Sequence, residues 1–525
     1  MKLKKRIAVL VLLAVIVVSI FGGCGTSDKN SADKGKTLNF GCTNFSDSLD
    51  PSAMINAAWC VSRYSIGEGL FRFDEEMNAQ PYISDKFKVN DENTDWKFHI
   101  RDGVKFSNGK DVTASAVVDS IKYMYEQEAN SNGNSTPSVF MQYESIIADD
   151  DSGMVEIVTS KPYADLCAVL AHPYFSILDV NSDLDIANNP IGTGPYAIKK
   201  YDTGVSIAME ANGYYWNGEV PYRNVNIIFI DDSSTKAMAL QSGDIDIVEN
   251  IVTTSDLEKL RDSSDFQVSE TIGMRCGFSY INQKRVLKDV NLRKAVLLAL
   301  DDETMCNVTV GGMYTPGCSV LPSTLDYGYK NLKDATPYDI KAAKKLLDKA
   351  EIIDSDGDGY REINGEMIDL SYLTYDSRNL TDFTEAVASQ LELIGIKVTI
   401  NTTDADTEWN MLVAGEYDLL ANNWMTVPVG DPYSYLDNWY SKSSANYCGY
   451  ANAKYDKLYG QLETEMDIKA RAGIIEELQQ ILIDDAAVLI HGYYHSNMCS
   501  SKKVEGAEIH TADYYWITTD MKPAK

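Results

Sequence analysis

The sequence predicts an α/β protein with at least two lobes. Segments with helical periodicity alternate with strand-like segments, a pattern typical of α/β folds with a substantially parallel sheet. The chain has 525 residues, which is too long for a single hydrophobic core. It contains no internal repeat, so the lobes are expected to be built from different segments.

Residues 94–127, "TDWKFHIRDGVKFSNGKDVTASAVVDSIKYMYEQ", hold the most regular local pattern. Three apolar residues alternate with polar ones, as in a half-buried strand: Trp96, Phe98 and Ile100. Thr113 is expected to N-cap a helix. The apolar face of that helix comprises Val117, Ile121 and Met124, with Val118 and Tyr125 beside it. This module has no nucleophile, paired acids or metal ligands, which indicates a scaffold.

Further strands are predicted at residues 154–160 and in the stretches "YAIKKYD", "VNIIFIDD" and "SGDIDIVEN", with a helix over residues 235–241. In the second half, Thr336 is expected to cap a helix that has Pro337 at its first position. Its inward residues are Ile340, Ala343 and Leu347. Another helix spans residues 380–394, ends at Gly395 and leads into a strand at 396–400. A long helix around residues 474–481 precedes "AAVLIHGYY".

The N-terminus has the form of a secretory signal. Residues 1–6 include four basic side chains, and residues 7–20 are apolar except for Ser19. That run is shorter than the ~20 residues of a membrane-spanning helix. The small residues before Cys24 resemble a bacterial lipobox. We expect residues 1–23 to be a lipoprotein signal peptide, Cys24 to be lipidated, and residues 24–37 to form a flexible tether. The alternative is an uncleaved membrane anchor.

Charge excludes nucleic acid as a partner, and cysteine spacing disfavours a metal site built from cysteines. Removing residues 1–23 leaves 43 basic against 77 acidic residues, a net charge of −34, and such a surface repels nucleic acid. Eight scattered cysteines remain, without a C-x-x-C pair: Cys42, Cys60, Cys167, Cys276, Cys306, Cys318, Cys448 and Cys499. Free or buried thiols are favoured over a metal site. A Cys42–Cys60 disulfide stays open.

Ordered motifs from residue 38 onward resemble one family. The stretch "FHIRDGVKFSNGKDVTASAV" is similar to its hallmark, an aromatic strand followed by "LRDGVKFSDG" and "TAEDV", with Ser115 and Ala116 in place of the usual acidic pair. The similarity continues in "PIGTGPYAIKKY", "NGYYWNG", "LQSGDIDI", "VNLRKAVLLALD", "AAKKLLDKAEIIDSDGDGYREINGE" and "GDPYSYLDNWY". The chain thus resembles the family 5 solute-binding proteins of ABC importers, which include oligopeptide-, dipeptide- and nickel-binding members.

The resemblance implies a two-lobe, periplasmic-binding-protein-like clamp of class II, with the extra subdomain of the peptide-binding cluster. Lobe I would comprise residues 38–272 and 495–525, with residues 73–188 as the extra subdomain, and lobe II would comprise residues 273–490. Two hinge crossings would lie near residues 274–278 and 491–494. Closure requires a ligand that makes more contacts with the closed form.

The resemblance also implies the role. The protein would capture a short peptide or a similar small solute outside the membrane and deliver it to ABC permease subunits. It would act as a monomer without a cofactor, lipid-anchored at the outer face of the cytoplasmic membrane or in the periplasmic space. The alternative ligand is a nickel or other metal chelate, as in metallophore-binding members.

Cleft residues are expected, by resemblance, near residues 44–48, 280–282 and 424–433. The ligand-binding candidates are Asn44, Phe45, Tyr280, Asn282, Trp424, Asp431 and Tyr433. Peptide-binding relatives place an Asp three residues after the Trp, where it pairs with the ligand's α-amine. This chain has Val427 there, and Asp431 is the nearest acidic substitute.

Two sequence patterns resemble metal sites, but each lacks some of the ligands that such a site requires. Asp354, Asp356, Asp358 and Gly359 have the spacing of a calcium loop, but position twelve is Gly365 rather than Glu. His491 and His495 would share one face of a strand. Two histidines alone do not complete a metal site, so structural roles are favoured. They keep the metal-chelate alternative open.

An exported, acidic, Tyr-rich chain is also compatible with a secreted glycan-active enzyme that uses two carboxylates. The sequence has no G-x-S-x-G elbow, H-E-x-x-H helix or isolated acidic motif. We therefore expect no catalytic residues. Turnover of chromogenic glycosides, against ligand binding without turnover, distinguishes the two classes.

Overall fold

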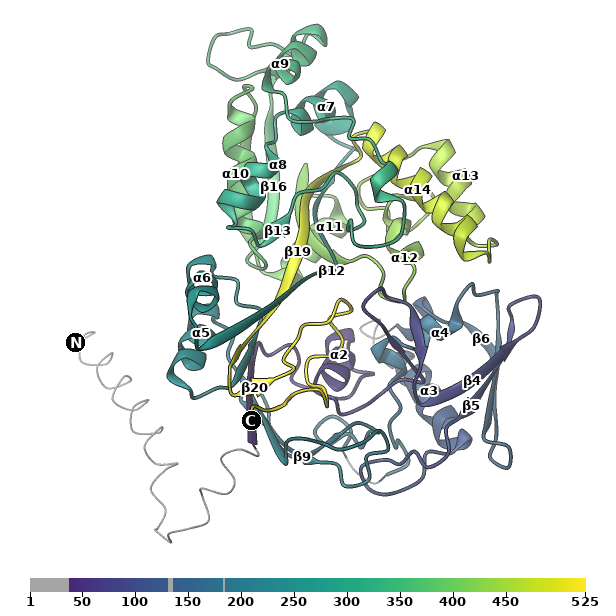
Figure 1. Cartoon of the computed structure of the whole chain (residues 1–525). Helices are drawn as coiled ribbons and strands as arrows, with labels where there is room; N and C mark the ends of the chain where they lie inside the picture. The colour runs from purple at the N-terminus through teal and green to yellow at the C-terminus, as the bar shows by residue number, and fades with distance from the viewer. Residues whose placement is uncertain (1–36, 131–135, 183–184) are drawn as a thin grey trace. The chain divides into compact units, whose positions relative to one another are not determined.

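The computed structural model describes residues 37–130, 136–182 and 185–525, and residues 38–525 form one compact unit (Figure 1). The predicted signal peptide, Cys24 and nearly all of the tether lie outside the described residues. Within the described part of the chain, no helix is both long and apolar enough to cross a membrane.

One eleven-stranded sheet organises this unit. Its order is β17-β16-β18-β12-β19-β11-β1-β10-β9-β8, and β13 pairs with β19 off this path. The strands are β1 Thr37–Cys42, β8 Tyr196–Asp202, β9 Ser206–Ala211, β10 Asn224–Phe229, β11 Ile247–Glu249, β12 Phe266–Ile281, β13 Tyr314–Thr315, β16 Asp369–Tyr375, β17 Lys397–Thr403, β18 Leu419–Met425 and β19 Val488–Ser501.

The strand directions are mixed, not mainly parallel as the alternation of elements had suggested. The pairs β1–β11, β16–β17 and β16–β18 are parallel. The pairs β8–β9, β9–β10, β11–β19, β12–β18 and β12–β19 are antiparallel. At the centre of the sheet, β12 and β19 run antiparallel to one another. Each also pairs antiparallel with its outer neighbour, β18 or β11.

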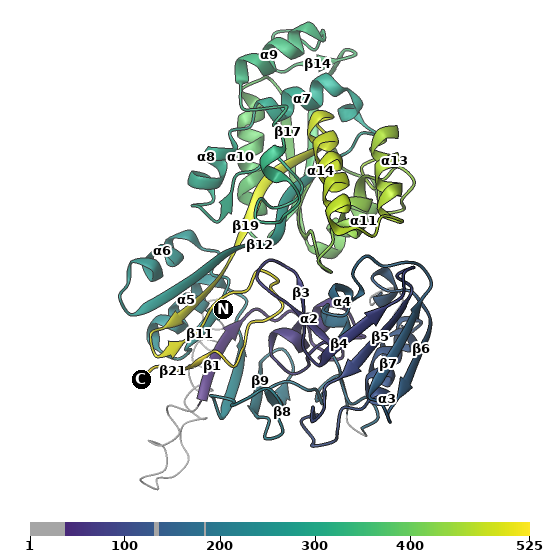
Figure 2. The same ribbon diagram turned by 45° about the vertical axis from the view of Figure 1, so that its right-hand side comes forward.

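The long strands β12 and β19 join two lobes, as Figure 2 shows. Toward lobe I, β19 pairs with β11; toward lobe II, β12 pairs with β18 from Arg275 onward. The β12–β19 register shifts between Ile272 and Cys276, a bulge that breaks the regular pairing. Nearby, Gly492 has φ +130°, and a Cβ there would lie 2.6 Å from the Thr315 carbonyl oxygen. Only glycine fits this crossing.

The scaffold module predicted from residue 94 is confirmed. Strand β5 (Asp95–Ile100) buries Trp96, Phe98 and Ile100, and α3 (Ala114–Glu128) begins after Thr113, whose Oγ1 accepts a 3.2 Å hydrogen bond from the Ala116 amide. The strand belongs to a separate sheet of order β4-β5-β7-β6. Its other strands are β4 Ser84–Val89, β6 Tyr143–Asp149 and β7 Met154–Thr159.

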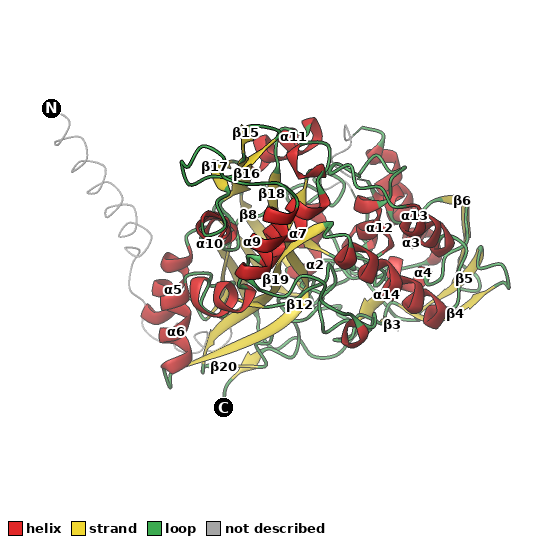
Figure 3. Ribbon diagram, turned by 90° about the horizontal axis from the view of Figure 1, so that it is seen from above, coloured by secondary structure: helices red, strands yellow, loops and turns green. Residues whose placement is uncertain are grey.

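Helices cover both faces of the sheet in lobe II (Figure 3). The neighbouring residues Leu419 and Leu420 of β18 enter different hydrophobic clusters, because side chains alternate across a strand. The longest described helix is α14 Ile468–Asp484, followed by α3 and then α10 Leu380–Glu392. The others are α2 Ile55–Arg63, α4 Leu166–Val169, α5 Ser233–Ser242, α6 Thr254–Asp262, α7 Val290–Leu298, α8 Asp302–Thr304, α9 Ile340–Lys349, α11 Ala405–Ala414, α12 Tyr433–Leu436 and α13 Ala453–Leu462.

One helix start differs from the prediction. Helix α9 is capped by Asp339, whose Oδ1 accepts a 2.9 Å hydrogen bond from the Ala342 amide. Thr336 and Pro337 precede the helix, because Asp339 is itself a strong capping residue closer to the apolar face. Helix α10 ends at Glu392, slightly before the predicted residue 394, and Gly395 adopts a positive φ of +78° beyond it, as expected for the glycine that ends this helical segment. Three short strand pairs complete the structure: β2 Phe71–Phe73 with β3 Ala79–Pro81, β14 Glu362–Ile363 with β15 Glu366–Met367, and β20 Val504–Glu505 with β21 Lys522–Pro523.

Candidate functional site

Three arginines gather around the crossing of β12 and β19. Arg63 ends α2, Arg275 lies in the β12 bulge, and Arg378 lies between β16 and α10. Arg63 and Arg275 are only 1% and 6% exposed. The Arg63 Nη2 lies 2.7 Å from Asp513 Oδ2, and the Arg275 Nε lies 3.8 Å from the same oxygen. We call Arg63, Arg275, Arg378 and Asp513 the arginine cluster.

Aromatic rings surround the guanidinium groups. The central carbon of Arg63 lies 4.2 Å from the Trp516 ring centroid and 5.2 Å from that of Trp59. Arg275 lies 5.9 Å from the Trp59 ring, and Arg378 lies 5.9 Å from that of Tyr494. These cation–π contacts favour keeping the guanidiniums charged at a site from which water is largely removed.

Several donors of this cluster are not used within the protein. Among the described residues, the buried Arg63 Nη1, Arg275 Nε and Trp59 Nε1 have no hydrogen-bond partner. A buried unpaired donor costs about 1–3 kcal/mol. Trp59 lies against both guanidiniums, so the three side chains belong to one cluster. A carboxylate is the kind of acceptor that such donors require.

The electrostatics favour an anion. Burial, and next the charge of Arg378, lower the pKa of Arg275 from 12.5 to about 10, while Asp513 acts in the opposite direction. Arg275 therefore stays charged at neutral pH. A carboxylate would offset this buried positive charge through charge-assisted hydrogen bonds.

One sequence-predicted residue lies beside the cluster, and a second precedes it in the chain. Phe45 packs against Trp516 and lies 5.1 Å from the Arg63 guanidinium. The backbone N–H of Asn44 donates a 3.0 Å hydrogen bond to Asp231 Oδ1, and the Asn44 Oδ1 is buried without a partner among the described residues. The end of β1 thus brings the predicted loop to this site.

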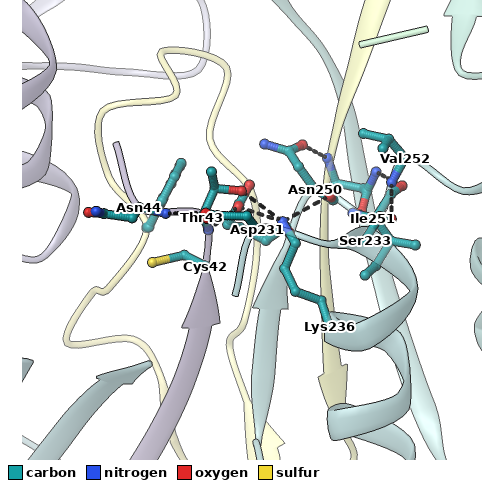
Figure 4. A network of polar contacts seen from close by, with 12 residues as sticks. Cys42, Thr43, Asn44, Asp231, Ser233, Lys236, Asn250, Ile251 and Val252 are labelled. Atoms are coloured by element: carbon teal, nitrogen blue, oxygen red, sulfur yellow. Dashed lines mark hydrogen bonds and ion pairs between the residues drawn. The ribbon is translucent and has the colours of Figure 1, made fainter. Parts of the chain in front are cut away.

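A buried ion pair fixes the end of β1 (Figure 4). The Lys236 Nζ lies 2.8 Å from Glu249 Oε1 and also donates to the Glu249 carbonyl and to Thr43 Oγ1. Glu249 Oε1 in turn accepts a 2.9 Å hydrogen bond from the Thr43 amide. The network links α5, β1 and β11, and so fixes the backbone from which Asn44 and Phe45 project.

Tyr280 and Asn282 make packing contacts inside lobe II. Tyr280 is fully buried, and its hydroxyl donates a 2.8 Å hydrogen bond to Asn438 Oδ1. The Asn282 amide donates to the carbonyls of Gly415 and Tyr417. Both residues therefore have hydrogen-bond partners within lobe II. In the sequence they follow Arg275, at the end of β12 and just beyond it.

The stretch from Trp424 to Tyr433 follows β18. Trp424 is half-buried and meets Phe278 edge-on. Asp431 Oδ2 accepts hydrogen bonds from the Arg471 Nη2 at 2.7 Å and the Arg471 Nε at 2.9 Å. Tyr433 donates to Glu463. The carboxylate proposed to bind an amine thus already has a guanidinium partner.

The two histidines have separate hydroxyl partners. The His491 Nε2 lies 2.9 Å from Ser279 Oγ, and burial lowers the pKa of His491 to about 3. The His495 Nε2 lies 2.7 Å from Thr315 Oγ1. Neither belongs to a group of metal-ligating side chains among the described residues.

The acidic loop does bring carboxylates together. One oxygen from each of Asp354, Asp356, Asp358 and Glu362 lies within 4.8 Å of the others. Sequence analysis missed Glu362, which occupies position nine of the calcium-loop spacing. Asp354 accepts hydrogen bonds from the Gly357 and Gly359 amides, so the loop already uses part of its acceptor capacity. All eight cysteines of the described chain are free thiols, and Cys42 and Cys60 each contact the Tyr64 hydroxyl instead of one another.

Comparison with known proteins identifies the family. Residues 78–447 match the model of the bacterial extracellular solute-binding proteins, family 5, middle region. The chain belongs to this family. Its members are transport proteins, so the protein is a substrate-binding component of an ABC importer with the two-lobe clamp fold, as the resemblance implied.

Individual relatives differ in their ligands. The chain is 25% identical to the nickel-binding protein NikA of Staphylococcus aureus, covering 98% of each chain, and 25% identical to the oligopeptide-binding protein AppA of Bacillus subtilis, covering 97% of each. Solved structures include S. aureus NikA with Ni(L-His)2, at TM-score 0.77 and 21% identity, covering 93% of this chain and 100% of that one. They also include B. subtilis AppA with a nonapeptide, at TM-score 0.76 and 22% identity, covering 93% and 99%. At these identities the solved structures establish the fold.

Proposed function

We propose that the protein is an extracytoplasmic, lipid-anchored receptor that captures a short peptide, or a zwitterion of similar size, and delivers it to ABC permease subunits. The observation that carries this proposal is the set of unpartnered N–H groups on Trp59, Arg63 and Arg275. They offer the donors that a peptide carboxylate requires, at the junction around which a two-lobe clamp closes. Phe45 borders the same place, and Asn44 precedes it in the chain with a buried Oδ1 that has no partner among the described residues.

Lobe II supplies the rest of the proposed site. Trp424, Asp431 and Tyr433 form the wall predicted from the sequence, with Tyr280 and Asn282 supporting it. Asp431 meets the ligand's amine in this proposal, although an ammonium there competes with Arg471. If peptides bind in this way, Asp431→Ala weakens binding by about 1.5–3 kcal/mol, the value of a lost charged hydrogen bond.

The alternative ligand is a nickel or metallophore chelate. Its support is the chemistry of the arginine cluster, because the carboxylates of a chelate are recognised by the same guanidiniums. His491 and His495, each held by a hydroxyl group, are the weaker part of this alternative.

Native mass spectrometry of freshly purified protein, followed by tryptophan fluorescence titration with mixed peptides and with nickel chelates, distinguishes the two ligands. Arg275→Met is expected to weaken binding of the true ligand at least about tenfold. The matched control is Arg261→Met, which removes an exposed ion pair with Glu270 and leaves affinity unchanged. Bound metal without peptide contradicts the peptide proposal, and equal affinities of the two variants contradict the assigned site.

The anchor is tested separately. If Cys24 is lipidated after removal of residues 1–23, Cys24→Ser releases the protein into the soluble exported fraction as a monomer. Membrane association that persists with an uncleaved N-terminus contradicts the lipoprotein proposal. Incubation with chromogenic glycosides is expected to give no turnover, because this is a binding protein.

A further inference from the structure

The arginine cluster carries more positive charge than its own carboxylate balances. Arg63, Arg275 and Arg378 are cationic, and within the described part of the chain Asp513 is the carboxylate paired with them. Tyr375 and Tyr494 also lie near Arg378, but burial raises the pKa of both phenols, so they stay neutral. Three cations face one anion.

Asp513 is committed mainly to one of these arginines. Its Oδ2 accepts the 2.7 Å hydrogen bond from Arg63, its carbonyl accepts a second from the Arg63 Nε, and its Oδ1 accepts one from the Trp516 indole at 2.8 Å. Arg275 is 3.8 Å away, beyond hydrogen-bond distance. Asp513 therefore neutralises Arg63 and leaves Arg275 and Arg378 without a matching carboxylate.

Burial makes this imbalance costly. Arg275 is 6% exposed and its Nε has no partner among the described residues. An uncompensated buried charge costs several kcal/mol, whereas a paired and hydrogen-bonded one is tolerated. A ligand with a single carboxylate balances one of the two remaining guanidiniums. A ligand with two carboxylates balances both.

We infer that the cluster selects ligands that present two carboxylates, whether these belong to an acidic peptide or to a metal chelate. This inference rests on the proposed function and narrows its substrate class. Trp59 lies against both Arg63 and Arg275, and its free indole N–H adds a neutral donor between them. The charge of Arg378 acts on Arg275, so the two guanidiniums without a matching carboxylate belong to the same site.

The test uses matched ligands and the full-length exported protein. Isothermal titration compares two sets of peptides of two to five residues that differ only by Glu in one set and Gln in the other. It also compares nickel complexed with histidine and nickel complexed with histamine, which lacks the carboxylates. If the ligand is a peptide, the Glu-containing peptides are expected to bind at least about tenfold more tightly than the Gln-containing ones. If the ligand is a metal chelate, the same preference is expected for nickel with histidine over nickel with histamine.

Variants then assign the preference to the cluster. Arg275→Met and, independently, Arg378→Gln are expected to reduce the Glu-over-Gln or histidine-over-histamine preference to less than about threefold, whereas Arg275→Lys, which keeps the charge, retains most of it. Arg261→Met again serves as the control. A thermal melt with one cooperative transition confirms that each variant is folded, and having two variants on different elements guards against the misfolding of one.

The outcomes separate the two proposals. Equal binding of Glu- and Gln-containing peptides, with equal binding of the two nickel complexes, overturns the dicarboxylate inference and leaves the peptide proposal standing. A preference that persists unchanged in both Arg275→Met and Arg378→Gln also overturns it. Absence of binding to every peptide and every chelate overturns both.

Discussion

The arginine cluster and the acidic loop are both concentrations of like charge. They differ in burial and in how many of their charged groups have hydrogen-bond partners within the protein. Three members of the cluster, Arg63, Arg275 and Asp513, are buried, Arg378 is half-buried, and its buried donors exceed its acceptors. In the loop, Asp354, Asp356 and Asp358 are exposed, and their carboxylates accept hydrogen bonds from neighbouring backbone amides. Water screens an exposed cluster, whereas a buried excess of charge requires a partner. Burial therefore distinguishes the proposed recognition site from a solvated turn.

The largest expected effect comes from breaking the buried pair. Arg63→Met leaves the Asp513 carboxylate buried without its 2.7 Å partner and is expected to reduce the free energy of unfolding by about 3–5 kcal/mol. Urea unfolding at neutral pH measures this. The matched change in the loop, Asp356→Asn, is expected to stay within about 0.5 kcal/mol. Equal urea midpoints for Arg63→Met and Asp356→Asn would contradict the idea that the buried arginine cluster depends more on its charge pairs than the exposed acidic loop does.

A buried acid that has no cationic partner in the described part of the chain sharpens the comparison. Glu408 on α11 is 3% exposed and accepts one hydrogen bond, from the Asn422 amide at 3.2 Å. Burial raises the pKa of Glu408 from 4.5 to about 7. Its contribution to stability is complete below pH 4.5 and is lost as pH rises through about 7, because the folded state holds the proton more tightly than the unfolded state.

Glu408→Gln is therefore expected to be more stable than the parent at about pH 8, by up to about 3 kcal/mol, with the difference vanishing toward about pH 4.5. Urea unfolding across this pH range provides the measurement. A difference between the two proteins that does not change with pH would contradict the assigned burial of the charge.

The smallest effect is expected from calcium at the acidic loop. Gly365 supplies no ligand at position twelve, and the loop carboxylates already accept backbone amides. Millimolar calcium is therefore expected to leave the melting temperature nearly unchanged, with Asp354→Asn as the control. A rise of many degrees that saturates at micromolar calcium would show that Glu362 completes a tight site.

Local patterns predicted much of the fold, because their causes are local. The alternation at Trp96, Phe98 and Ile100 and the cap at Thr113 depend on residues a few positions apart. The cap of α9 was misassigned because Thr336 and Asp339 are both competent capping residues, and only the position of the apolar face separates them.

The site was harder to predict because its contacts are long-range. Arg63 and Asp513 are 450 positions apart in the sequence, and no spacing rule joins them. Asp431 resembled a free acid because Arg471, its partner, lies 40 positions later in the sequence, on α14. One signal was available: Arg275 is the single charged residue in the otherwise apolar or small stretch "GMRCGFSYI". A charge in a buried strand identifies a functional candidate.

The bulge in β12 has a mechanical consequence. Arg275 lies where β12 loses its regular pairing with β19 and begins to pair with β18. In the proposed function, the residue that offers a donor to the ligand therefore belongs to the same few peptide units that would bend when the lobes close. A ligand bound to this guanidinium would act directly on the crossing of β12 and β19, and occupancy and closure would be coupled through one residue.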